Sequence, residues 1–175
     1  MNPRTDRILL GLVGALAIAL VWVVAGTLEP RVVHAGETAP NFSIVADDGR
    51  TMTRSNFGGK LLVLNFWATW CPPCIEEIPT LDAFQRLMGP QGVVVLGVSV
   101  DRNEKLYRQF LERTRVTFRT ARDPEENIPS SYGTFQFPET YIIDSRGKVV
   151  QKVISSQNWM DPEFLARVKT LLAGV

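Results

Sequence analysis

The chain opens with a long apolar stretch. Residues Ile8 to Leu28 include no charged side chain and are mostly leucine, valine, alanine, isoleucine and glycine. As an α-helix this stretch would span roughly 30 Å, the thickness of the hydrocarbon core of a bilayer. Arg4 and Arg7 precede it, and this positive flank predicts a cytoplasmic N-terminus with everything after Leu28 on the other side. The pattern therefore predicts a single N-terminal transmembrane anchor.

A cleaved signal peptide is the alternative interpretation. Val33-His34-Ala35 offers small residues at plausible cleavage positions, but the apolar run exceeds the usual core of about 7–15 residues. Both interpretations place the remaining chain outside the cytoplasm, on the periplasmic or cell-surface side, either anchored or secreted after cleavage near Ala35. We expect residues 1–28 to form the cytoplasmic N-terminus and anchor, 29–39 a tether, and 40–175 a folded domain.

Beyond the tether, the spacing of apolar residues predicts a three-layer α/β domain with a mixed sheet and an N-terminal β-hairpin extension. Leu61 to Trp67 is nearly continuously apolar, as in a central strand covered on both faces. From Pro72 to about Met88, apolar residues recur at helical spacing. The other predicted elements are short strands at Phe42–Val45 and Thr51–Thr53, a strand at Val93–Val98, a helix at Asn103–Arg115 with Leu106, Phe110 and Leu111 inward, a hairpin of Thr140–Ile143 and Lys148–Ile154, and an amphipathic final helix whose apolar residues are Phe164, Leu165, Val168, Leu171 and Leu172.

Charge and composition argue against some classes of function. Nineteen basic and eighteen acidic residues give a net charge of +1, so there is no electrostatic reason to expect a nucleic-acid partner. The 45% hydrophobic content is enough for a real core without metal or disulfide staples. The two cysteines are therefore free to serve chemistry.

The two cysteines form the motif Cys71-Pro72-Pro73-Cys74, directly after the predicted central strand and at the start of a helix. A thiol at a helix N-terminus feels the positive end of the dipole, which favours the nucleophilic thiolate. A second thiol three residues later can resolve a mixed disulfide. The prolines lack N–H groups, so they remove two amides that would stabilise the thiolate further, which favours a reducing couple.

A cysteine pair can also serve other chemistries. A structural disulfide closing so small a loop would stabilise little. Zinc needs about four ligands, and the one histidine, His34, lies in the tether. A peroxidase frame, Pro-x-x-x-Thr-x-x-Cys, is absent because Thr69 stands two residues before Cys71 and Leu64 replaces the proline. Two thiolates suit Cu(I), so a copper-handling protein stays open as an alternative.

Two segments carry a family resemblance: Asn65 to Cys74 (Asn-Phe-Trp-Ala-Thr-Trp-Cys-Pro-Pro-Cys) and Phe137 to Asp144 (Phe-Pro-Glu-Thr-Tyr-Ile-Ile-Asp). The chain from about Ala39 to its final helix resembles the exported TlpA-like thioredoxins, which include the ResA-type and CcmG-type (DsbE-type) proteins of cytochrome c maturation. The resemblance implies a thioredoxin fold and thiol–disulfide oxidoreductase activity. It also implies no cofactor beyond the redox-active cysteine pair.

The resemblance also assigns roles to residues. Cys71 would attack, Cys74 would resolve, and Pro138 would be a cis-proline facing the pair, an uncommon and purposeful conformation. Phe137 would present its backbone to a docked substrate chain by short β-type pairing. The substrate surface would be completed by Trp70, Pro72 and Pro73.

One position departs from cytoplasmic thioredoxins, which carry a buried aspartate where Asn65 stands. Asparagine cannot exchange a proton at neutral pH, so another group must deprotonate Cys74. Glu77 lies three residues after Cys74 on the same helical face, and ResA-type members have a glutamate at the matching place. We predict that Glu77 has this role, with a solvated charge near the helix start as the alternative.

The resemblance implies a reductant of disulfides in exported substrates. The implied target is the Cys-x-x-Cys-His haem-attachment motif of apocytochrome c, which must be a dithiol to receive haem. Electrons would come from a membrane dithiol donor of the CcdA or DsbD kind, because this compartment supplies no reducing pool. The alternatives are a disulfide oxidant or isomerase, and a Cu(I)-handling assembly protein for an oxidase.

Overall fold

The chain divides into two compact units, Met1–Arg31 and Val32–Val175, and the computed structural model describes residues 3–27 and 32–174. Helix α1 (Pro3–Thr27) has 25 residues and is about 37 Å long. Within it, Arg7–Val24 is long and apolar enough to cross a membrane, and its side chains are exposed in the isolated chain. Leu28 and positions 29–31 of the predicted tether lie outside the described residues.

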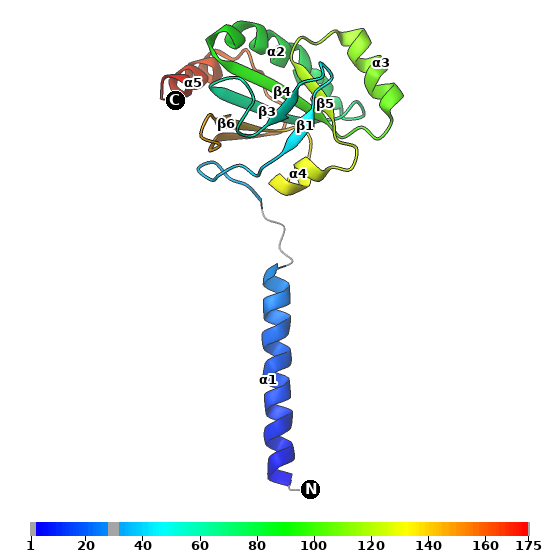
Figure 1. The fold of residues 1–175 in the computed structure, drawn as a ribbon, viewed down its shortest axis with the longest axis vertical. Coiled ribbons are helices and arrows are strands. Elements are labelled where there is room, and N and C mark those ends of the chain that lie inside the picture. The colour runs from blue at the N-terminus through cyan, green and yellow to red at the C-terminus, as the bar shows by residue number, and fades with distance from the viewer. Residues whose placement is uncertain (1–2, 28–31, 175) are drawn as a thin grey trace. The chain divides into compact units, whose positions relative to one another are not determined.

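A five-stranded mixed sheet forms the centre of the second unit (Figure 1), in the order β5-β4-β3-β6-β7. Strands β3, β4 and β5 run parallel, whereas β6 and β7 add to β3 as an antiparallel hairpin. The mixed sheet predicted from the sequence is confirmed. The strands are β3 (Leu61–Trp67), β4 (Val93–Ser99), β5 (Arg119–Arg122), β6 (Glu139–Asp144) and β7 (Val149–Ile154).

Helices cover both faces of this sheet and complete the three layers of a thioredoxin fold. All seven residues of β3 are buried, and they alternate between the two cores, as expected for a strand covered on both faces. Helices α2, α3 and α5 contribute side chains to one core. Helix α4 and residues 33–57, which precede β3, contribute to the other. The helices are α2 (Pro72–Met88), followed by the short 3₁₀ turn η1 (Gly89–Gln91), α3 (Glu104–Thr114), α4 (Asn127–Tyr132) and α5 (Pro162–Ala173).

The N-terminal hairpin is also present. Strands β1 (Ser43–Val45) and β2 (Thr51–Thr53) form a separate antiparallel pair. Gly49 has a φ of +80°, which glycine adopts without a steric penalty, and its N–H donates to the carbonyl of Ala46 at 2.9 Å. The predicted Asp-Asp-Gly turn therefore joins the two strands.

Two details of the sequence interpretation were wrong or incomplete. Leu106 is 53% exposed rather than inward, because the next residue, Tyr107, occupies the buried face of α3. The Tyr107 ring packs 6.0 Å from that of Trp67, and its hydroxyl donates to Asp47. Strand β5 was not predicted, since its sequence Arg-Thr-Ala-Arg carries no apolar run.

Candidate active site at the Cys71–Cys74 disulfide

Cys71 and Cys74 are joined by a disulfide at the N-terminal end of α2, with their Cα atoms 5.3 Å apart. Cys71 is the residue before the helix, with extended backbone angles of φ −103° and ψ 101°. It is 5% exposed, whereas Cys74, one turn into the helix, is fully buried. Of the two cysteines, Cys71 alone retains some exposure to solvent.

Pro72 and Pro73 occupy the first two positions of α2. Proline fixes φ at a helical value and lacks an N–H, so it suits positions whose amides have no intrahelical partner. The first hydrogen bond of the helix runs from the Ile75 N–H to the Cys71 carbonyl at 3.2 Å. The surface beside Cys71 is thus rigid and offers no amide donor from these two residues.

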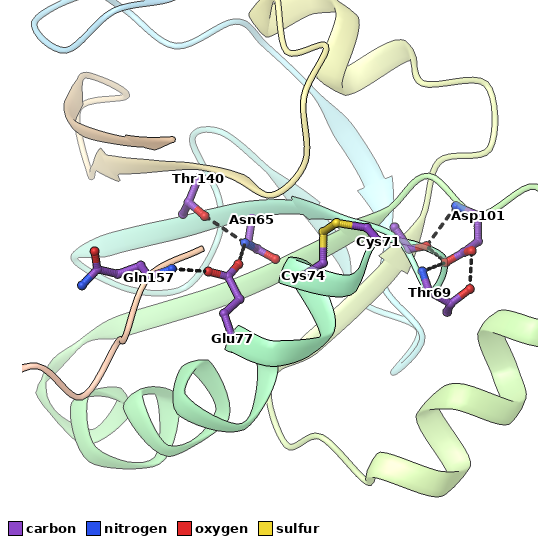
Figure 2. The surroundings of a disulfide bond; sticks show 9 residues. Asn65, Thr69, Cys71, Cys74, Glu77, Asp101, Thr140 and Gln157 are labelled. Carbon is purple, nitrogen blue, oxygen red and sulfur yellow. Dashed lines mark hydrogen bonds between the residues drawn. A yellow bond between two sulfur atoms is a disulfide. The ribbon is translucent and has the colours of Figure 1, made fainter. Parts of the chain in front are cut away.

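The link between β3 and the cysteines is anchored by Asp101, which the sequence interpretation missed. Its buried carboxylate, just beyond β4, accepts hydrogen bonds from the Thr69 N–H at 2.9 Å and the Thr69 hydroxyl at 2.6 Å (Figure 2). The hydroxyl of Ser99 donates to the same carboxylate at 2.6 Å. The available signal was the pair of polar residues Ser99 and Asp101 at the end of a buried parallel strand, because the ends of parallel strands meet at one edge of a sheet.

Glu77 lies beneath the disulfide and is 3% exposed, so the solvated-charge alternative is wrong. Its Oε1 accepts a hydrogen bond from Asn65 Nδ2 at 2.8 Å. Its Oε2 accepts from the Gln157 N–H at 2.9 Å and from Trp159 Nε1 at 3.2 Å (Figure 2 draws the first of these two). Burial raises the pKa of Glu77, and the three hydrogen bonds lower it in part.

Replacing Glu77 by glutamine is expected to remove a pH dependence of the unfolding free energy. Because burial raises the folded-state pKa of Glu77 above its ordinary value of 4.5, the folded protein binds this proton more tightly than the unfolded chain. The stability that the proton contributes is fully present below the unfolded pKa and is lost as pH rises through the folded pKa.

Urea unfolding of the oxidised protein at about pH 4 to 8 measures this effect. Wild type should lose more stability than Glu77→Gln as the pH rises. The exposed neighbour Glu76 provides the matched control, and Glu76→Gln should follow wild type. Parallel curves for Glu77→Gln and wild type would contradict the prediction.

Asn65 ties Glu77 to the sheet. Besides its bond to Glu77, Asn65 Nδ2 donates to the hydroxyl of Thr140 on β6 at 2.8 Å. Its Oδ1 is buried and has no hydrogen-bond partner among the described residues. One amide thus connects β3, β6 and α2 directly below the disulfide.

The Phe137–Pro138 peptide bond is cis, directly before β6. Glu139 pairs with Phe66 near the end of β3. The loop that holds the cis-proline therefore lies beside the segment that leads from Trp67 to Cys71. The ring of Phe137 meets that of Trp70 edge to face, with centroids 6.1 Å apart. The contact brings the cis-proline loop to the residue next to Cys71.

An apolar surface surrounds this contact. Trp70 is 63% exposed, and Phe135 and Ile154 are also exposed. A surface pocket of about 330 Å³ lies alongside, lined by Gln136, Phe137, Pro138, Ile154 and Ser155. Exposed aromatic and aliphatic groups at the cis-proline loop suit the docking of an extended polypeptide.

The sequence match extends over most of the chain. Residues 35–152 match the model of the AhpC/TSA family. The thiol-disulfide oxidoreductase ResA of Geobacillus thermodenitrificans is 35% identical over 127 residues, which cover 73% of this chain and 72% of the relative. The thioredoxin-like protein YneN of Bacillus subtilis is 33% identical over 150 residues, covering 81% of this chain and 87% of YneN.

Solved structures give the same result for the fold. A putative thiol:disulfide interchange protein DsbE from Chlorobium tepidum superposes with a TM-score of 0.73 at 26% identity, covering 81% of this chain and 99% of that one. Enzymes of this kind use a redox-active disulfide and no other cofactor, and their substrates are proteins that contain disulfides. With its cysteine pair at the start of α2 and a cis-proline alongside, the chain belongs to the AhpC/TSA family as a thiol–disulfide oxidoreductase of the ResA type with a thioredoxin fold.

Proposed function

We propose that this oxidoreductase reduces disulfide bonds in proteins exported from the cytoplasm. The observation that carries the proposal is the pair of prolines at the first two positions of α2, which remove two amides that would stabilise the Cys71 thiolate and with it the reduced form. The order of attack rests on the unequal exposure of the two cysteines, since Cys71 is 5% exposed and Cys74 is fully buried. The Cys71 thiolate attacks the substrate disulfide, forms a mixed disulfide and releases one substrate thiolate. Cys74 then attacks Cys71, which releases the second substrate thiolate and leaves the enzyme oxidised by two electrons.

The substrate docks on the surface beside Cys71. Trp70 and Phe137 supply apolar contact, and the backbone at Phe137, before the cis-proline Pro138, pairs with the extended substrate chain. Pro72 and Pro73 form the other side of this docking surface. Apolar groups there also exclude water from the sulfurs during exchange.

Glu77 receives the proton of Cys74 when that thiol attacks. A raised pKa suits this role, because a buried carboxylate with an elevated pKa holds a proton better than one in water. Asn65, which cannot itself take up a proton, keeps Glu77 oriented through its 2.8 Å hydrogen bond.

The proposed substrate is apocytochrome c, whose Cys-x-x-Cys-His motif must be reduced before haem attachment. The proposed electron donor is a membrane dithiol protein of the CcdA or DsbD kind, which would return the Cys71–Cys74 pair to its reduced state. Both assignments rest on the similarity to ResA-type proteins.

The reduction potential of the Cys71–Cys74 pair, measured against glutathione or dithiothreitol, tests the direction of electron flow. We expect a value of about −200 to −300 mV, because two prolines at the helix start remove donors that would stabilise the Cys71 thiolate and hence the reduced form. A disulfide-bonded peptide containing Cys-x-x-Cys-His should then be reduced by the dithiol enzyme. A potential near the roughly −120 mV of a strong oxidant would instead assign disulfide formation.

We further propose that α1 anchors the enzyme in the membrane and that the compact unit Val32–Val175 is an extracytoplasmic domain. Residues 32–39 of the expected tether belong to this unit, since Val33 is buried and its N–H donates to the Tyr132 carbonyl at 3.0 Å. The support is the apolar span Arg7–Val24 and its positive N-terminal flank. The protein should stay with membranes through a high-salt wash, and protease added to intact spheroplasts should digest the domain. A soluble mature chain beginning near Gly36, identified by N-terminal sequencing, would show that the segment is cleaved.

A further inference from the structure

The Asn65 amide is held in one orientation beneath the disulfide. A carboxamide nitrogen carries two N–H groups, and those of Asn65 donate to Glu77 Oε1 and to the Thr140 hydroxyl, each at 2.8 Å. Glu77 Oε2 accepts from Gln157 and Trp159, and in the ionised carboxylate Oε1 is an acceptor as well, so the amide nitrogen rather than the oxygen faces it. Asn65 Oδ1 is therefore fixed on the opposite side of the amide.

Figure 2 shows that this oxygen is directed toward Cys74. Asn65 is 1% exposed, and Oδ1 has no hydrogen-bond partner within residues 3–27 and 32–174. A buried acceptor without a donor is unfavourable and calls for a physical explanation. In the oxidised enzyme the Cys74 sulfur is part of the disulfide and carries no hydrogen, so it cannot supply the missing donor.

Reduction changes this situation. The disulfide takes up two electrons and two protons, and the Cys74 sulfur gains the hydrogen that a neighbouring acceptor can receive. We propose that Asn65 Oδ1 accepts a hydrogen bond from the Cys74 thiol whenever the Cys71–Cys74 bond is open. Asn65 is thereby a positioning residue that holds the resolving cysteine as a thiol and directs its S–H away from the Cys71 sulfur.

This bond has a thermodynamic consequence. The oxidised enzyme contains an unsatisfied buried acceptor that the reduced enzyme satisfies, so the contact favours the dithiol over the disulfide. The inference rests on the thiol–disulfide chemistry of this pair, and it requires neither the proposed substrate nor the proposed direction of electron flow.

The direct test is the infrared S–H stretching band of the full-length Cys71→Ser protein. Because the chain has two cysteines, Cys74 is then its one thiol. We expect a band at the lower frequency of a hydrogen-bonded thiol, moving to the unbonded frequency in Cys71→Ser/Asn65→Leu. Thr140→Val, which keeps Asn65, should not change it.

An unbonded band in Cys71→Ser itself would overturn the proposal, and this outcome needs no substitution at Asn65. An unchanged band in the Asn65→Leu form would overturn it as well. Neither measurement involves a substrate. Failure of the proposed reductase function would therefore not affect the evidence for the hydrogen bond between Cys74 and Asn65.

A second measurement uses the cysteine pair itself. Asn65→Leu should lower the equilibrium constant for reduction about tenfold, which makes the potential about 30 mV more negative for two electrons. The same shift is expected when Asn65→Leu is made in a Glu77→Gln background, where the Glu77 charge is absent from both proteins. A potential that is unchanged or more positive in both backgrounds would overturn the proposal.

Discussion

Serine at position 71 should reduce disulfide reductase activity to the uncatalysed rate. Serine at position 74 should trap the enzyme in a mixed disulfide with its substrate. The reason is the difference in exposure, since Cys71 is 5% exposed and Cys74 is fully buried. Only Cys71 can reach a substrate disulfide, and a serine hydroxyl does not replace a thiolate in disulfide exchange. In Cys74→Ser the first attack proceeds, but no internal thiol releases the partner.

The measurement is turnover with a disulfide-bonded protein, combined with non-reducing electrophoresis to detect mixed disulfides. Cys71→Ser should form none, and the double variant Cys71→Ser/Cys74→Ser serves as the control for adducts unrelated to this pair. Full turnover by Cys74→Ser, or adducts formed by Cys71→Ser alone, would reverse the assigned roles.

Removing the Asp101 carboxylate should cost about 2–4 kcal/mol of unfolding free energy and lower the rate of substrate reduction. This carboxylate receives the Thr69 N–H, the Thr69 hydroxyl and the Ser99 hydroxyl, and all three lose their acceptor in Asp101→Ala. Because Thr69 is two residues before Cys71, its release also loosens the position of the nucleophile.

A graded set of variants distinguishes the loss of the Asp101 hydrogen bonds from the loss of one negative charge. Thr69→Val removes one of the three donors and should cost about 1 kcal/mol. Glu112→Ala removes an exposed carboxylate of α3 and should change stability by no more than about 0.5 kcal/mol. Urea unfolding of the three variants decides the matter: equal losses in Asp101→Ala and Thr69→Val would show that the carboxylate does not hold this link.

Elements with strong apolar patterns could be predicted from the sequence, because burial dictated them. The strand Leu61–Trp67 and the helix Pro72–Met88 lie within the predicted bounds, since both faces of the strand and one face of the helix must be apolar. Strand β5 escaped prediction because its place at the sheet edge depends on hydrogen bonds to β4. Leu106 and Tyr107 are adjacent, and only tertiary contacts decide which of them faces the core.

Some features of the site could also be predicted from the sequence, and others could not. The spacing of the cysteines and their place at a strand-to-helix junction could be predicted, because local chemistry and helix geometry fix them. Asp101 and Trp159 were not identified as site residues, since their hydrogen bonds reach Thr69 and Glu77 across 32 and 82 positions of the chain. Glu77 could be placed near Cys74 by helical periodicity, but its burial depends on this distant segment.

The hydrogen bonds of Glu77 also set an order of events during folding. The cysteines and Glu77 leave the ribosome well before Gln157 and Trp159, which follow Glu77 by 80 and 82 positions. Until that segment joins the fold, Glu77 lacks two of its three donors. A growing chain that has not yet reached Trp159 therefore carries its two cysteines above a carboxylate that Asn65 alone holds.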